Sequence, residues 1–329
     1  MWYLGGRPIE LDIIEHKFQD LLGSKTPEEH GMNLYEMIDA AKNGKLKALY
    51  VMGDNPLFNY PDREHIEDAF NKIDFLIVQD ISLNDTVKLA DVVFPANSWL
   101  EKDGTFINLG RSLQRLRKAL SMDGCWDDWK IVAEVAKKLG MKKSYESSKD
   151  VWEEIRKVSP LYRDVDYVGL DEQALTWPYM GEPIRGLEGD FKVEGLEQVL
   201  GNVAKGSDGF MGLTNPVLML ERPLFHSGSM SGMSKALLSI YGAPYFKISK
   251  TLALRYGFKE GDKVRVIMEK GEIDASAQID VNMQDGVVYL SNIFEGVGYM
   301  GVVGYKVDAV VGSLVITNNN IVDIVRVED

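Results

Sequence analysis

The sequence is poor in the residues from which proteins build metal and redox centres, because it has one cysteine, Cys125, and four histidines. A single thiol excludes a disulphide within the chain and an iron–sulphur cluster held by four cysteines of this chain. His16, His30 and His65 have no partner at metal-ligand spacing, so we expect no metal site built by this chain alone. Cys125 precedes a predicted helix, and we expect it to be a buried or incidental thiol.

Long apolar runs and a basic surface are also missing. No apolar run approaches the roughly 20 residues of a membrane-spanning helix, and the first residues show no signal-peptide pattern. The formal net charge of −13 argues against a nucleic-acid partner, although backbone amides and a few cations can still hold an anionic ligand. We therefore expect a cytoplasmic protein with no membrane span, which would reach the cytoplasmic side of the inner membrane only through partners.

Three short apolar runs, at residues 46–52, 75–78 and 91–94, each end abruptly in a polar loop. Helix-like stretches separate the runs, and this alternation is typical of a parallel sheet built from β-α-β units. Ligands of such sheets lie just beyond the carboxyl ends of the strands. The sequence therefore predicts an α/β domain whose binding residues lie in the loops after these runs.

These loops supply the candidate ligand-binding residues. They are Gly53, Asp54, Asn55 and Pro56 after the first run, Gln79 and Asp80 after the second, and Asn97, Lys102, Gly104 and Thr105 after the third. Glycine lets a ligand approach the backbone, and an acidic residue at a strand end can accept hydrogen bonds from ribose hydroxyls. Each loop also has a simpler explanation, because Gly-Asp-Asn-Pro forms ordinary turns and an aspartate after a strand can cap a turn.

The pattern along the chain divides it into four parts. We expect a lead-in at 1–30 with a helix over 13–22, an α/β domain at 31–177, a glycine-rich linker at 178–214, and a β-rich domain at 215–329. Helices are predicted over 34–41, 63–71, 85–90, 127–139, 150–158 and 251–256. Strands are predicted over 217–220, 245–248, 263–269, 273–280, 287–290 and 321–327, and a compact β-barrel is the natural closure for them.

Four segments carry a family resemblance: GDNP at 53–56, QDISLNDT at 79–86, ADVVFPANSWLEKDGTF at 90–106 and QRLRKA at 114–119. They resemble the molybdopterin oxidoreductase family, which includes formate dehydrogenases and the large iron–sulphur subunit of respiratory complex I. The resemblance implies a Rossmann-like nucleotide-binding domain, followed by a small double-psi β-barrel that caps the pterin cofactors. It also implies that the loop residues named above lie near molybdopterin guanine dinucleotide carrying molybdenum or tungsten.

A further motif contributes His226, Ser227 and Ser229, in a stretch that resembles the His-x-Gly-Thr-Met sequence opening the capping domain of this family. Under the resemblance these side chains would face a pterin or dithiolene, whereas a lone histidine is often only structural. Arg115 and Arg117 alternate along a predicted strand, where they could face a phosphate, an acidic partner or solvent.

One stretch departs from the family pattern. Where relatives read Asn-Thr-Glu-Gly-Arg, this chain reads Asn-Leu-Gly-Arg-Ser at 108–112, so the glutamate is lost and the arginine is displaced by one position. Such degeneration favours the complex I branch, in which the fold persists without molybdenum. Catalytic relatives also bind their metal through a cysteine or selenocysteine of an earlier domain, and their electrons leave through cysteine-held clusters.

Three functions stay open. The favoured one is a non-catalytic subunit or split C-terminal part of a complex I-like oxidoreductase, without a catalytic residue of its own. The second is the cofactor-capping half of a two-chain molybdenum or tungsten formate dehydrogenase, and the third is a stand-alone nucleotide-binding module. The first two predict a cluster-bearing redox subunit as partner, together with NADH- or flavin-binding subunits in the first case.

Overall fold

The computed structural model describes residues 3–4, 7–8, 31–108, 112–158, 162–176, 215–221, 223–224, 226, 228–291, 299–302, 304–307, 314–318 and 321–327. The chain forms two compact units, which we call unit 1 (residues 1–40, 44–54 and 73–191) and unit 2 (residues 41–43, 55–72 and 192–329). The helix predicted over 13–22 and the linker at 178–214 lie outside the described residues. Among those described, no helix combines the length and apolar character that a membrane crossing requires.

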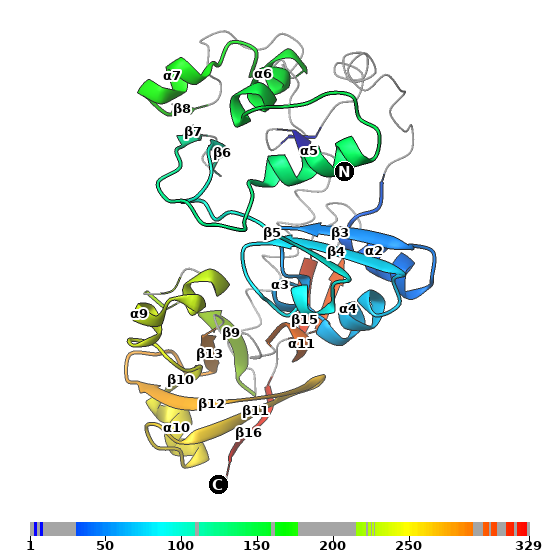
Figure 1. Cartoon of the computed structure of the whole chain (residues 1–329). Coiled ribbons are helices and arrows are strands. Elements are labelled where there is room, and N and C mark those ends of the chain that lie inside the picture. The colour runs from blue at the N-terminus through cyan, green and yellow to red at the C-terminus, as the bar shows by residue number, and fades with distance from the viewer. Residues whose placement is uncertain are drawn as a thin grey trace, which may run out of the picture. The chain divides into compact units, whose positions relative to one another are not determined.

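Unit 1 contains a parallel sheet of three strands in the order β3-β4-β5 (Figure 1). The strands are β3 (Ala48–Met52), β4 (Phe75–Asp80) and β5 (Val92–Pro95), which confirms the three predicted runs. Leu76 and Val78 of the central strand are buried in the core. Because both pairings are parallel, the carboxyl ends of all three strands lie at one edge, where the polar loops begin.

Four helices agree with the sequence prediction to within two residues at each end. They are α2 (Leu34–Lys42), α4 (Arg63–Phe70), α5 (Asp128–Lys138) and α6 (Ser148–Val158). α4 begins as predicted, since the side chain of Asp62 accepts a hydrogen bond from the backbone N–H of His65 at 3.3 Å. The helix predicted over 85–90 is wrong in extent: only the 3-10 turn η1 (Val87–Leu89) forms, because the backbone is already extended at Ala90.

A second, antiparallel sheet of unit 1 joins segments far apart in the sequence. It consists of β6 (Gly104–Ile107), β7 (Ser112–Leu116) and β8 (Leu175–Thr176). Leu113 of β7 packs in a cluster with Trp152 of α6 and with Tyr167 of α7 (Tyr167–Glu172). The indole N–H of Trp152 donates to the carbonyl of Val165 at 3.0 Å, so this buried polar group is satisfied.

Unit 2 is built on a six-stranded mixed sheet in the order β16-β11-β12-β10-β13-β9. The strands are β9 (Val217–Glu221), β10 (Tyr245–Ser249), β11 (Lys263–Met268), β12 (Gly271–Asp280), β13 (Val287–Ser291) and β16 (Ile321–Arg326), so all six predicted strands are confirmed. The β10–β12 and β9–β13 pairs are parallel, and the other pairs are antiparallel. The N–H of Ile321 donates to the carbonyl of Pro216 at 2.9 Å, so the two ends of the sheet meet and the sheet is curled.

The core of unit 2 fills this curled sheet. Phe246, Val264 and Val288 are fully buried there, and burial of each such side chain contributes about 1.5–3 kcal/mol. The predicted helix over 251–256 is α10 (Lys250–Tyr256), which the side chain of Ser249 caps. The smaller elements are β1 (Tyr3–Leu4) and β2 (Arg7–Pro8) of unit 1, and α3 (Pro56–Asn59), η3 (Ser229–Met233), α9 (Lys235–Leu238), α11 (Tyr299–Val302), β14 (Gly304–Val307) and β15 (Leu314–Asn318) of unit 2.

Candidate functional site

The loop after β3 opens with Gly53, whose φ of 62° lies in the left-handed region that favours glycine. The N–H of Gly53 donates to the carbonyl of Gln79 at 2.8 Å, which ties this loop to the end of β4. A Cβ atom at Gly53 would meet no atom of the described residues within 4 Å, so they leave space beside the backbone at this position. Glycine is needed here for its backbone conformation, and the space is available to a ligand.

Gln79 is fully buried at the carboxyl end of β4, with 0% of its surface exposed. Its Oε1 accepts a hydrogen bond from the hydroxyl of Tyr50 on β3, and its Nε2 donates to Oδ1 of Asp128 at 2.7 Å. Both ends of the amide are therefore satisfied, which fixes its orientation. As a result Gln79 holds the first residue of α5 at the edge of the parallel sheet.

The other oxygen of Asp128 accepts a hydrogen bond from the ammonium group of Lys102, in the loop after β5. The side chains of Lys102 and Asp128 are 18% and 33% exposed, so this ion pair is half-buried. Burial and, secondarily, the negative charge of Asp128 raise the pKa of Tyr50, which keeps its hydroxyl protonated as the donor to Gln79. We call Tyr50, Gln79, Lys102 and Asp128 the strand-edge cluster.

Asn97, after β5, is buried with 5% of its surface exposed. Its Nδ2 donates to Oδ1 of Asp127 at 2.7 Å and its backbone N–H donates to the carbonyl of Trp126 at 2.8 Å. Its Oδ1 is buried and has no hydrogen-bond partner among the described residues. A buried acceptor left without a partner is unusual in folded proteins and calls for an explanation.

The remaining candidates of unit 1 have local structural roles. One carboxylate oxygen of Asp80 accepts hydrogen bonds from the backbone N–H of Ser82 at 3.0 Å and from its hydroxyl at 3.2 Å, as the turn-capping interpretation predicts. Gly104 and Thr105 belong to β6, where Thr105 lies opposite Arg115 of β7. Asp54 is half-buried at the end of the segment assigned to unit 1.

Asn55 and Pro56 open the part of unit 2 that contains α3. Asn55 is buried, and its carbonyl accepts hydrogen bonds from the N–H groups of Phe58 at 3.0 Å and Asn59 at 2.9 Å. Pro56 is the first residue of the helix, where its missing N–H costs no hydrogen bond. This loop is therefore a helix start as well as a candidate binding loop.

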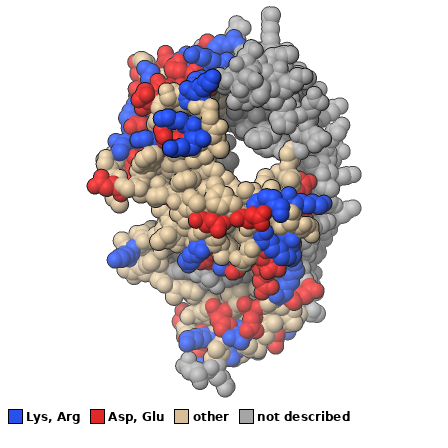
Figure 2. Space-filling view, turned by 45° about the vertical axis from the view of Figure 1, so that its right-hand side comes forward, with Lys and Arg blue, Asp and Glu red and all other residues tan. Residues whose placement is uncertain are grey.

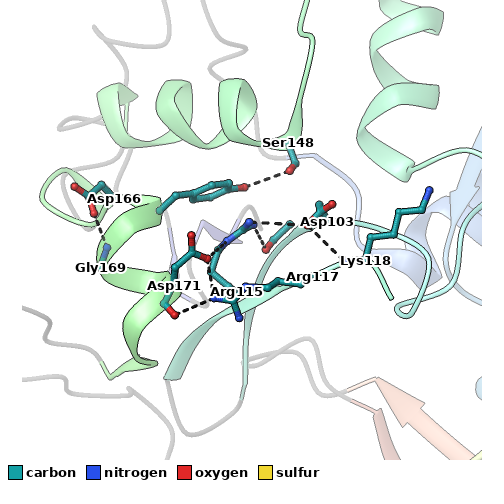
Figure 3. Close-up of polar contacts among 10 residues, drawn as sticks. Asp103, Arg115, Arg117, Lys118, Ser148, Asp166, Gly169 and Asp171 are labelled. Atoms are coloured by element: carbon teal, nitrogen blue, oxygen red, sulfur yellow. Dashed lines mark hydrogen bonds and ion pairs between the residues drawn. The ribbon is translucent and has the colours of Figure 1, made fainter. Parts of the chain in front are cut away.

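Arg115 of β7 and Arg117, which follows the strand, differ in their surroundings (Figure 3). The side chain of Arg115 is 11% exposed. Its guanidinium group donates to Oδ1 of Asp171 at 3.1 Å and to the carbonyl of Gly104 at 3.0 Å, and it lies 3.8 Å from the ring centre of Tyr167. Arg117 is 57% exposed and donates to the same carboxylate at 2.9 Å. These hydrogen bonds, above all the one from Arg115, lower the pKa of Asp171. The solvent-facing interpretation therefore holds for Arg117 but is wrong for Arg115, which joins β7 to α7.

His226 is the described member of the capping motif in unit 2. It is 3% exposed, and its Nδ1 lies 3.1 Å from the hydroxyl oxygen of Ser231 while its Nε2 lies 3.3 Å from the carbonyl of Tyr241. Both ring nitrogens are therefore in hydrogen-bond contact with protein, as the structural interpretation predicts. Ser227 lies outside the described residues, and Ser229 begins η3.

Two aspartates that complete the site, Asp127 and Asp128, were not predicted from the sequence. They precede and begin α5, and Asp128 lies 49 positions from Gln79 in the sequence. The available signal was a pair of acidic residues at the start of an amphipathic helix that follows a strand–loop segment. Helix periodicity located that helix, but it could not show that its first turn meets the end of β4.

Outside the cluster, one face of the molecule carries charges of both signs (Figure 2), and the described residues form no group of metal ligands. Figure 2 shows basic and acidic side chains interspersed on the face it presents, rather than a face of one sign. Within the described part of the chain, no group of three or more histidine, cysteine, aspartate or glutamate residues could hold a metal ion. Cys125 is half-buried, which agrees with the expectation of a buried or incidental thiol.

Two family models match the chain, one in each half of the sequence. Residues 13–138 match the family described as Molybdopterin oxidoreductase, and residues 221–319 match the Molydopterin dinucleotide binding domain. The chain belongs to the molybdopterin oxidoreductase superfamily. The second match supports a molybdopterin cofactor for this member of the superfamily.

Among curated relatives of this superfamily member is the F420-dependent formate dehydrogenase subunit alpha of Methanocaldococcus jannaschii, which is 37% identical over 275 residues. The F420-dependent formate dehydrogenase 1 subunit alpha of Methanococcus maripaludis is 35% identical over 272 residues. Each match covers 79% of this chain but only 40% of the relative, so the chain spans less than half the length of these proteins.

A solved structure with a similar fold is the acetylene hydratase from Pelobacter acetylenicus, with a TM-score of 0.66 and 14% sequence identity. The similarity covers 96% of this chain and 50% of that one. At this identity the likeness concerns the fold alone.

Proposed function

We propose that this chain binds the guanine dinucleotide form of molybdopterin and is the cofactor-holding part of an oxidoreductase of the formate dehydrogenase type. The observation that carries the proposal is the strand-edge cluster, in which Gln79 and Lys102 hold the carboxylate of Asp128 at the carboxyl ends of parallel strands. Ligands of open α/β sheets bind at this edge. The reaction class is taken from the names of the relatives, which are formate dehydrogenase alpha subunits.

The donors and acceptors of the cluster fit a guanine nucleotide. Guanine presents two adjacent donors, N1–H and the N2 amino group, and a carboxylate such as Asp128 can accept from both. The ammonium group of Lys102 holds the other oxygen of Asp128 in place, and Gly53 allows the pyrophosphate to approach the backbone. Asp80 retains a second carboxylate oxygen that could accept from a ribose hydroxyl.

The other candidate residues have supporting roles in this proposal. Asp54, Asn55 and Pro56 would continue the loop beside the nucleotide, and Gly104 and Thr105 would shape the wall after β5. By the family resemblance, His226, Ser227 and Ser229 would be pterin-binding residues. The bound cofactor would supply the two-electron redox chemistry, whereas the chain's own residues bind it, orient it and exclude water.

The domain boundaries and partners belong to the same proposal. We place the α/β domain at 31–177, the linker at 178–214 and a double-psi barrel at 215–329, after a lead-in at 1–30. The relatives are named as alpha subunits, which supports further subunits around this chain. Because the sequence has one cysteine, a four-cysteine iron–sulphur cluster would be held by other protein segments, in the cluster-bearing redox partner.

A second candidate function is the complex I-like role without molybdenum or tungsten, alongside NADH- and flavin-binding subunits. The departure at 108–112 favours it, since the family glutamate is replaced there. In the structure the side chain of Asn108 accepts a hydrogen bond from the N–H of Ser112 at 2.9 Å, and the three residues between them lie outside the described part of the chain. The formate dehydrogenase relatives outweigh this observation, and the stand-alone module is the least supported alternative.

The test is the metal and nucleotide content of the protein, expressed in a host that makes the cofactor and purified with its co-expressed partners. Stoichiometric molybdenum or tungsten, together with guanosine monophosphate released by mild acid, is the expected result. Asp128→Asn should lower both contents, and the exposed Asp123→Asn is the matched control. Full nucleotide and metal content in Asp128→Asn would exclude the proposed role of the cluster, and absence of both from the wild-type assembly would favour the complex I-like candidate.

A further inference from the structure

Unit 1 contains a polar cavity of about 430 Å³ beside α5. We call it the lysine pocket, and its charged lining residues are Lys118, Asp127, Lys130, Glu134, Lys137, Lys143 and Glu146. No member of the strand-edge cluster lines it. Its volume is within the range of small-molecule sites in proteins.

Two buried polar atoms of lining residues have no hydrogen-bond partner in the part of the chain that the structure describes. They are Oδ1 of Asn97, an acceptor, and the indole Nε1 of Trp129, a donor. Asn97 has only 5% of its surface exposed, and its Nδ2 donates a hydrogen bond to Asp127, which fixes the orientation of the amide. A ligand that donates to Asn97 and accepts from Trp129 would satisfy both atoms, whose burial is otherwise costly.

The rest of the lining favours an anionic ligand with a flat ring. The lining contains four lysines and three carboxylates, so basic residues outnumber acidic ones there. In the whole chain the balance is the reverse, with 37 basic and 50 acidic residues. Trp126, Trp129 and Tyr145 add aromatic surface, and the ammonium group of Lys130 lies 4.6 Å from the ring centre of Trp126. Aromatic side chains of this kind stack on nucleobases, and lysines bind phosphate groups as point charges.

We propose that the lysine pocket binds a purine nucleotide, at a site separate from the strand-edge cluster. A purine edge places a donor beside an acceptor, as in the N6 amino group and N1 of adenine or in N1–H and O6 of guanine. That pair matches the unsatisfied Asn97 Oδ1 and Trp129 Nε1, while the phosphates reach Lys118 and Lys130. The proposal does not depend on the identity of the cofactor bound elsewhere in the chain.

The experiment is an isothermal titration of the full-length protein with ADP, repeated with GDP and with tripolyphosphate as a probe that lacks a base. Lys118→Gln combined with Lys130→Gln should weaken ADP binding at least about tenfold through loss of two charged contacts. Trp129→Phe keeps an aromatic ring but removes the N–H, and it should weaken binding about fivefold. The exposed Lys149→Gln serves as control for the lysine substitutions and should leave binding unchanged.

Three results would overturn the proposal. They are an absence of ADP and GDP binding at millimolar concentration, tripolyphosphate binding as tight as that of ADP, and loss of ADP binding in Asp128→Asn with retention in the lysine variant. Far-ultraviolet circular dichroism identifies any variant that fails to fold, and if Trp129→Phe unfolds, the exposed lysine pair decides the question. Failure here would leave the metal and nucleotide content that tests the proposed function unaffected.

Discussion

A substitution of Arg115 tests whether this residue of β7 has a structural role or binds a ligand. We expect Arg115→Met to lower the free energy of unfolding of unit 1 by about 2–3 kcal/mol. The substitution removes two charge-assisted hydrogen bonds, typically ~1.5–3 kcal/mol each, and a cation–π contact of about 0.5–2 kcal/mol with Tyr167. The expected loss is smaller than the sum of these lower limits because Asp171 is 46% exposed and solvent screens its attraction to Arg115.

The assay is urea denaturation followed by tryptophan fluorescence, since Trp152 lies in the same core as Tyr167. Arg117→Met is the matched control and should cost less than about 1 kcal/mol, because an exposed ion pair contributes little. Arg115→Lys keeps the charge but loses the planar fork, so its effect should fall between the two. Equal losses for Arg115→Met and Arg117→Met, or none for either, would refute the structural role assigned to Arg115.

Three further outcomes follow from the local geometry. Burial and the hydrogen bond to Glu154 raise the pKa of Tyr145 to about 12. The difference in phenolate absorbance between the wild type and Tyr145→Phe should therefore titrate near pH 12. The Glu154→Gln substitution should lower this pKa toward 10. Gly53→Ala should cost about 1 kcal/mol in a thermal unfolding measurement through its positive φ alone, and a neutral effect would contradict the left-handed conformation. Arg265 lowers the pKa of Asp274, so the stabilisation by this carboxylate should be present above about pH 4 and lost as pH falls further, which a comparison of wild type with Asp274→Asn at pH 7 and pH 3 would detect.

The parts of the fold that the sequence predicted are those set by local pattern. β3, β4 and β5 are short apolar runs that end at polar loops, and α10 lies between a serine cap and Gly257, so each could be located from neighbouring residues. η1 was predicted too long, because the alternation of apolar and polar residues at 85–90 does not reveal where the backbone extends.

The parts that could not be predicted depend on contacts between distant segments. β8 pairs with β7 across some sixty positions of sequence. Because β8 has only two residues, it is too short to show the alternation that would predict a strand. The same limit applies to the site. Gln79 and Lys102 were identified as candidates, but their shared partner Asp128 belongs to a helix that pattern alone cannot orient.

The central claim is that the carboxylate of Asp128 recognises guanine at the edge of the parallel sheet. The most direct measurement compares the dissociation constants of guanosine and inosine monophosphates, because inosine lacks the N2 amino group. The wild-type chain should prefer the guanosine nucleotide by about tenfold, Asp123→Asn should keep that preference, and Asp128→Asn should lose it. An unchanged preference in Asp128→Asn would contradict the account.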